Sequence, residues 1–245
     1  MRFAVFLAIM LPLAAQEPLL RIPPAHATVE IDGRPIAIAL SGEVRGAGRP
    51  DSYTVSLAVD LSDLQAHAAE ILRAHIDRSE ECGERIHILQ AELVPAPAIA
   101  VLTAQMHFER WACAKALGKT VRKRLVAGDG IVKVTLTPVL ENPTRARLEA
   151  TVREIQADGS LGELLRSGSL GASLKEKIRT SVQSALDKAT DFRATLPPVL
   201  QDLVRLRSVS FADAGAGRLF LALDAEALIS GPQLQQLRQS VSRHP

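Results

Sequence analysis

Aromatic side chains and cysteines are scarce in this sequence, and no long apolar run occurs after its first residues. Aromatic residues make up 3% of the chain, whereas apolar residues make up 47%. The core must therefore consist mainly of Leu, Val, Ile and Ala. No segment after residue 15 approaches the ~18 uninterrupted apolar residues of a membrane-spanning helix. An aliphatic interior of this kind is compatible with alkyl chains, and it is also typical of an ordinary solid core.

Motifs for catalysis and nucleotide binding are also missing. The sequence has no G-x-S-x-G turn for a nucleophilic serine and no glycine-rich phosphate loop after a strand. His87 and His107 would lie close together if their segments pair, but no third metal ligand is specified. The 29 basic and 27 acidic residues give a net charge of +2, which does not indicate nucleic-acid binding. We therefore expect no metal, no cofactor and no enzymatic activity.

The N-terminal residues are typical of an export signal. Arg2, the apolar run Phe3 to Leu11 and the small pair Ala14 and Ala15 predict a cleavable signal peptide over residues 1–15. We expect residues 16–245 to form a single domain in the periplasm or the external medium, without a membrane anchor. In such a compartment the two cysteines, Cys82 and Cys113, predict one disulfide.

Hydrophobic periodicity predicts an α+β fold, in which a long curved antiparallel β-sheet wraps around one or two long amphipathic helices. Alternation of period two predicts strands, and apolar residues three and four apart predict helices. Predicted strands cover 36–40, 53–59, 86–94, 98–111, 132–140, 148–152, 209–211 and 219–223. Predicted helices cover 61–82, 161–189 with a break at 168–171, and 230–241. The first helix would begin with Ser62 as its N-cap, end at Cys82 and bury a stripe of Leu64, Ala68, Ile71 and Leu72 against the concave side of the sheet.

This arrangement resembles the tubular lipid-binding (TULIP) superfamily. The resemblance rests on Leu61 to Cys82, on Arg110-Trp111-Ala112-Cys113, and on Leu161 to Leu223 with its Gly168-Ser169-Leu170-Gly171 break and Leu196-Pro197-Pro198. It implies a single module whose highly curved antiparallel sheet and helix enclose an elongated apolar groove for acyl chains. The family has no shared catalytic residues to carry over.

The function expected from these features is that of an exported, non-enzymatic carrier or sensor of a lipid or another elongated apolar molecule. An alternative is an exported envelope-assembly or protein-interaction domain with a solid core and no ligand. In the first case, inward-facing aliphatic side chains of strands and helix would bind the ligand. These residues are Leu102, Met106, Val134, Leu136, Leu174, Ile178 and Val182.

A basic cluster surrounds the single tryptophan, Trp111. It indicates either a transient contact with anionic lipid head groups or an acidic partner, or simply a solvated helix or loop face. Trp111 itself would pack over the predicted disulfide. The cluster consists of Arg110, Lys115, Lys119, Arg122, Lys123 and Arg124.

Overall fold

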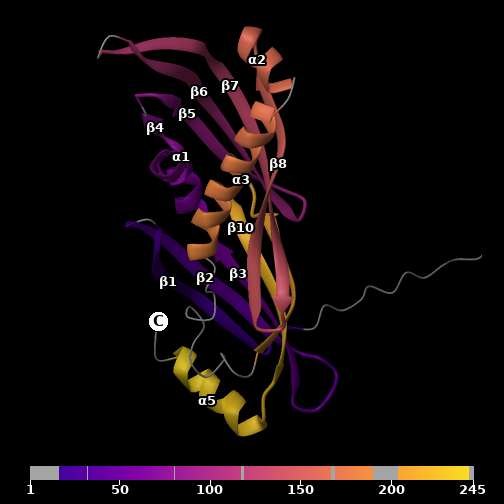
Figure 1. Cartoon of the computed structure of the whole chain (residues 1–245). Helices are drawn as coiled ribbons and strands as arrows, with labels where there is room; N and C mark the ends of the chain where they lie inside the picture. The colour runs from indigo at the N-terminus through magenta and orange to yellow at the C-terminus, as the bar shows by residue number, and fades with distance from the viewer. Residues whose placement is uncertain are drawn as a thin grey trace, which may run out of the picture.

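The structure, a computed structural model, describes residues 17–31, 33–79, 81–116, 119–166, 169–189 and 204–242. Within these ranges the chain forms two five-stranded antiparallel sheets, accompanied by helices (Figure 1). The predicted signal peptide 1–15 and the Leu196-Pro197-Pro198 stretch, on which part of the family resemblance rests, lie outside the described residues. No helix of the described ranges is long and apolar enough to cross a membrane.

The first sheet has the strand order β1-β2-β3-β10-β9 and is antiparallel throughout. Alternate side chains of each strand face the core, so that Val55, Leu57 and Val59 of β3 are buried and their neighbours are partly exposed. Its strands are Leu20–Ile31 (β1), Arg34–Gly46 (β2), Ser52–Asp60 (β3), Val204–Asp213 (β9) and Leu219–Leu228 (β10).

The second sheet has the order β4-β5-β6-β7-β8. Its central strands β6 and β7 have 18 and 24 residues, well beyond the usual strand length of about five or six. Phe108, Met106 and Leu102 of β6 point into the core and are almost fully buried. The strands are Arg78–Ser79 (β4), Gly83–Ala96 (β5), Ile99–Ala116 (β6), Lys119–Asn142 (β7) and Arg145–Ala157 (β8).

Four helices of the described chain accompany these sheets: Ser62–Ile76 (α1), Gly159–Arg166 (α2), Ser169–Ala189 (α3) and Gly231–Ser242 (α5). Helix α1 packs between the sheets. Its residues Ala68 and Leu72 join the large core cluster that both sheets share, whereas Ile71 packs with Ile31 and Ile36 of β1 and β2. Helix α3 runs alongside β8 and contacts α1 (Figure 1).

The two sheets meet where turns of the second sheet reach the edge strand β9 of the first. The Leu206 amide donates a hydrogen bond to the Pro143 carbonyl (2.6 Å), and the Phe211 amide donates one to the Ala98 carbonyl (3.3 Å). An open sheet edge is a template for unwanted strand pairing. These contacts cover part of the β9 edge and join the sheets.

The predicted fold class is wrong. Antiparallel strands make up most of the described chain, helices make up a much smaller part, and the strands form two separate sheets rather than one sheet wrapped around long helices. The reason is pairing over long sequence distances: β3 pairs with β10, placing Asp60 opposite Phe220, so β10 occupies the free edge of β3 and the first sheet does not continue into β5. Local periodicity cannot reveal such a pairing.

Most individual elements agree with the sequence prediction. The hairpins that turn at 95–97, 142–144 and 214–217 and the closing helix are all present, and residues 87 and 107 are cross-strand partners as expected. The break near residue 168 falls between α2 and α3, although residues 167–168 are not described. The buried stripe on α1 is confirmed for Ala68, Ile71 and Leu72.

The predicted boundaries of the first helix are wrong. Helix α1 ends at Ile76 rather than Cys82, because Asp77 leaves helical geometry and its carboxylate accepts a hydrogen bond from the Ile88 amide of β5 (2.8 Å). Ser62 is not the N-cap either, since its amide and hydroxyl both donate to Asp60. Residues 78–79 then pair with β5, so strand pairing replaces the last helical turn that the sequence suggested.

Candidate functional site

An apolar seam lies between helices α1 and α3 and the inner face of the second sheet. All ten of its lining side chains are aliphatic or methionine, because the core-facing positions of the strands and both helical stripes converge there. The lining consists of Leu72 and Ile76 from α1, Ile88 from β5, Leu102, Ala104 and Met106 from β6, Val132 and Val134 from β7, and Ile178 and Val182 from α3.

The seam is closed in this structure. Its free volume is about 10 Å³, which is space for roughly one water molecule. A lipid chain does not fit into this volume unless the packed elements separate. The seam is therefore a packed interface with the composition, but without the open space, of an apolar binding site.

Five of the seven predicted ligand-contacting residues line this seam: Leu102, Met106, Val134, Ile178 and Val182. Leu136 and Leu174 are buried in the same core cluster but do not line it. Sequence reasoning omitted the α1 residues Leu72 and Ile76 from the site, although Leu72 belongs to the predicted apolar stripe. Whether any of these side chains contacts a ligand stays a prediction.

Polar contacts attach the described side chains of α3 to the second sheet at two points. The Gln183 amide group accepts a hydrogen bond from the Ala150 amide (3.1 Å) and donates one to the Leu148 carbonyl (2.7 Å), both on the edge strand β8. Closer to the middle of the helix, Lys177 forms an ion pair with Glu84 of β5 (2.5 Å). These contacts lie on the sheet side of α3, and a motion of α3 away from the sheet must break them.

An open groove of about 860 Å³ lies on the outer face of the first sheet. Its floor has small side chains, including Ser41, Ala58 and Ala222. The consecutive prolines Pro23 and Pro24 form part of its wall, at the point where the register of β1 with β2 shifts. A ligand here would be covered from one side, whereas binding pockets usually bury most of a ligand's surface. The closed seam is therefore the stronger candidate site.

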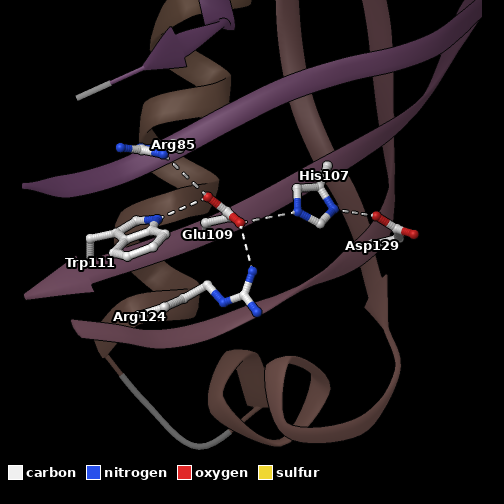
Figure 2. Close-up of polar contacts among 6 residues, drawn as sticks. All are labelled: Arg85, His107, Glu109, Trp111, Arg124 and Asp129. Carbon is white, nitrogen blue, oxygen red and sulfur yellow. Dashed lines mark hydrogen bonds and ion pairs between the residues drawn. The ribbon is translucent and has the colours of Figure 1, made fainter. Parts of the chain in front are cut away.

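A polar network crosses the outer face of the second sheet, centred on Glu109 of β6 (Figure 2). Its carboxylate accepts hydrogen bonds from the Trp111 indole (2.8 Å) and Arg124 (3.1 Å), and Arg85 approaches it to 3.8 Å. The Trp111 hydrogen bond is the main reason that the pKa of Glu109 lies below its usual value, and Arg124 and His107 act in the same direction against desolvation. The Glu109 carboxylate thus links β6 to Arg85 of β5 and to Arg124 of β7 through charged contacts.

His107 and His87 are directly opposite each other on β6 and β5, yet each ring binds a different carboxylate. The Nδ1 atom of His107 lies 2.6 Å from Asp129, and that of His87 lies 2.7 Å from Asp77. Among the described residues, no group of three or more His, Cys, Asp or Glu side chains is arranged to hold a metal ion.

The predicted disulfide between Cys82 and Cys113 is confirmed, with a Cα–Cα distance of 5.7 Å. The secondary-structure elements that it joins differ from those expected. Because α1 ends at Ile76, Cys82 lies in the turn between β4 and β5, so the bond joins that turn to β6 rather than joining a helix to the sheet. The ring of Trp111 stacks with the Arg85 guanidinium, at 4.9 Å from the ring centre.

No protein-family model and no curated protein sequence matches this chain. Among solved structures, the chain is similar to a lipopolysaccharide binding protein, with 13% sequence identity and a TM-score of 0.39. The alignment covers 81% of this chain and 55% of the other, so this chain spans about half the length of that protein.

Proposed function

We propose that this chain is a non-enzymatic binding protein that takes up a lipid or another elongated apolar ligand between α3 and the second sheet. The observation that supports the proposal is the seam itself, whose ten lining side chains are all apolar and come from both helices and three strands. Each buried methylene of a ligand would contribute about 0.8 kcal/mol. A long chain could therefore offset the loss of α3 packing where a short one could not.

Export and family membership belong to the same proposal. The Cys82–Cys113 disulfide is compatible with an oxidising compartment such as the periplasm or the external medium. The tubular lipid-binding superfamily is the family in which we place the chain on its sequence pattern. The chain would then act as a single module that carries or senses its ligand.

A second candidate function is an exported interaction or envelope-assembly domain with a solid core. The free volume of about 10 Å³ in the seam favours this alternative, because no ligand fits unless the packed elements separate. The two functions differ in one observable property, which is saturable binding of an apolar chain.

Titration with a fatty-acid series from octanoate to stearate tests the proposal. We expect affinity to rise with chain length until the seam is full, and extraction of the natively purified protein to release a stoichiometric apolar molecule detected by mass spectrometry. Two substitutions change the seam in opposite directions: Val134→Trp should exclude the longer chains, and Ile178→Ala should admit bulkier ones.

Leu223→Ala is the matched control, because Leu223 is buried in the core contributed by β10 and does not line the seam. It should lower the free energy of unfolding by about 2–5 kcal/mol, as large-to-small core substitutions do, with unchanged chain-length dependence. Binding that ignores chain length, or a wild-type protein that binds none of these fatty acids, would favour the interaction domain.

A further inference from the structure

The paired ends of β6 and β7 extend beyond the second sheet as a two-stranded ribbon. Strand β5 begins at Gly83, opposite Trp111, so from Ala112 onward β6 pairs with β7 and has no β5 residue opposite it. Figure 1 shows these two strand ends reaching past β5. We name residues 112–116 and 119–125 the basic ribbon. Its side chains at 112–115 and 119–125 are all exposed, so the basic ribbon contributes little to the core.

The disulfide anchors this ribbon to the body of the protein. An isolated two-stranded hairpin is marginally stable in water. Cys113 lies on the β6 strand of the ribbon and is bonded to Cys82, and Arg122 on the β7 strand forms an ion pair with Glu81 (2.6 Å). Both strands are thus fastened to the turn that precedes β5, which keeps an exposed element in a defined orientation.

Positive charge is concentrated on the basic ribbon and at its base. Six basic residues and no acidic residue occur between positions 110 and 128, which leaves 23 basic and 27 acidic residues in the rest of the chain. Arg122 and Arg124 are paired with Glu81 and Glu109, but no ion pair within the described ranges holds Lys115, Lys119 or Lys123. The molecule is therefore electrostatically polarised, with unpaired ammonium groups on the basic ribbon.

Aliphatic side chains accompany these lysines. Val121 and Leu125 expose 55% and 57% of their surface and are among the largest exposures of apolar side chains in the described ranges. Lys119, Val121 and Lys123 of β7 are two residues apart and therefore share one face of the ribbon. On the same face of β6, Ala114 lies opposite Val121 and Ala112 lies opposite Lys123. One face of the basic ribbon thus combines small and branched apolar groups with two cations.

We propose that the basic ribbon docks on the surface of an anionic lipid bilayer. Val121 and Leu125 enter the boundary between head groups and acyl chains, while the ammonium groups of Lys119 and Lys123 remain at the lipid phosphates. An acidic protein partner fits less well, because cores of protein interfaces are enriched in aromatic residues and depleted in lysine. This docking surface is separate from the seam and does not require that the seam bind a ligand.

Vesicle flotation with the full chain tests this proposal. The vesicles are phosphatidylcholine alone or phosphatidylcholine mixed with phosphatidylglycerol, at low and high salt. We expect binding to the mixed vesicles only, weakened by salt. The double variant Lys119→Gln/Lys123→Gln should bind about 25-fold more weakly, at about fivefold for each lysine near an anionic surface. Leu125→Ser should lose the residual binding that the wild type retains at high salt.

The matched control is Arg49→Gln/Arg205→Gln, which removes the same charge from exposed positions on the first sheet and its β2–β3 turn. Its affinity should remain within twofold of the wild type. An equal loss in this control would mean that net charge alone drives binding and would overturn the proposal. So would equal binding to neutral vesicles, no binding to either vesicle, or capture by an acidic polypeptide without binding to the mixed vesicles. Circular dichroism verifies that each variant is folded.

Discussion

The side-chain amide of Gln65 on α1 binds the backbone of Leu219 on β10, with 2.6 Å between the Gln65 Oε1 atom and the Leu219 nitrogen. The Nε2 atom of the same side chain donates to the carbonyl of Leu93 on β5 (2.8 Å) and to that of Gly217 (2.9 Å). One glutamine thereby joins the helix to both sheets. No motif in the sequence distinguishes this residue from other glutamines on exposed helix faces.

Gln65→Leu should destabilise the fold. It leaves the Leu219 amide and two carbonyls without their partner, which should lower the free energy of unfolding by about 2–3 kcal/mol. Urea denaturation followed by circular dichroism measures the change. Gln105→Leu on the exposed face of β6 is the control and should alter stability by less than about 0.5 kcal/mol. Equal effects of the two substitutions would show that the Gln65 hydrogen bonds add nothing beyond a surface glutamine.

Ile71→Asp should unfold or aggregate the protein. Ile71 is 9% exposed and packs with Ile31 and Ile36, so an aspartate there would be buried without a partner, at a cost of several kcal/mol. Ala74→Asp, on the exposed side of the same helix, introduces the same charge and should leave the protein folded. Thermal unfolding and size-exclusion chromatography separate the two outcomes; a folded, cooperative Ile71→Asp variant would mean that this face of α1 is not held against β1 and β2.

Replacing both cysteines by serine should lower the free energy of unfolding by about 2–4 kcal/mol, because the bond closes a loop between residues 31 positions apart. The loss of local stability should be greatest in the basic ribbon, because Cys113 attaches its β6 strand to the rest of the protein. Limited trypsin digestion, which cuts after Lys and Arg, should become faster there in the variant. Titration of the unfolded, unreduced wild type should detect no free thiol, and two free thiols would contradict the bond.

Removing the charge at Glu109 should change how the free energy of unfolding depends on pH in the acidic range. The pKa of Glu109 in the folded protein lies below its usual value of 4.5, mainly through the Trp111 hydrogen bond. The ionised carboxylate therefore stabilises the folded state above about pH 4.5, and this contribution disappears as the pH falls through the lower folded pKa. Glu109→Gln should be less stable than the wild type at neutral pH and equally stable in strong acid.

Urea denaturation at a series of pH values measures this difference, and the fluorescence of Trp111, the single tryptophan, reports on its hydrogen bond locally. Glu92→Gln is the control, because it removes one exposed carboxylate from β5 of the same sheet without breaking the network. A difference in the free energy of unfolding between wild type and Glu109→Gln that does not change with pH would contradict the role assigned to the ionised carboxylate.

Several features of this protein were determined by the sequence alone. Alternation at Val132, Val134 and Leu136 and at Leu148, Ala150 and Val152, with a turn between them, predicts two antiparallel strands, and the structure contains them. The Pro95-Ala96-Pro97 turn places residue 87 opposite residue 107, as observed. The disulfide follows from an even cysteine count together with the expectation of export. The strand and turn predictions succeed because each depends on neighbouring residues or on a single turn. The disulfide prediction succeeds because two cysteines allow one pairing.

The tertiary structure alone decided how these elements assemble and whether the candidate site is open. The division into two sheets depends on the pairing of β3 with β10, whose residues Asp60 and Phe220 are remote in sequence. The early end of α1 depends on a hydrogen bond from the Ile88 amide to Asp77. The sequence assigns Val134 and Ile178 to the lining of a groove or to a solid core, and the structure places them in a seam that is packed almost without a void. Periodicity specifies which face of an element is apolar, whereas the partner that covers that face, and how closely, is set by contacts between distant segments.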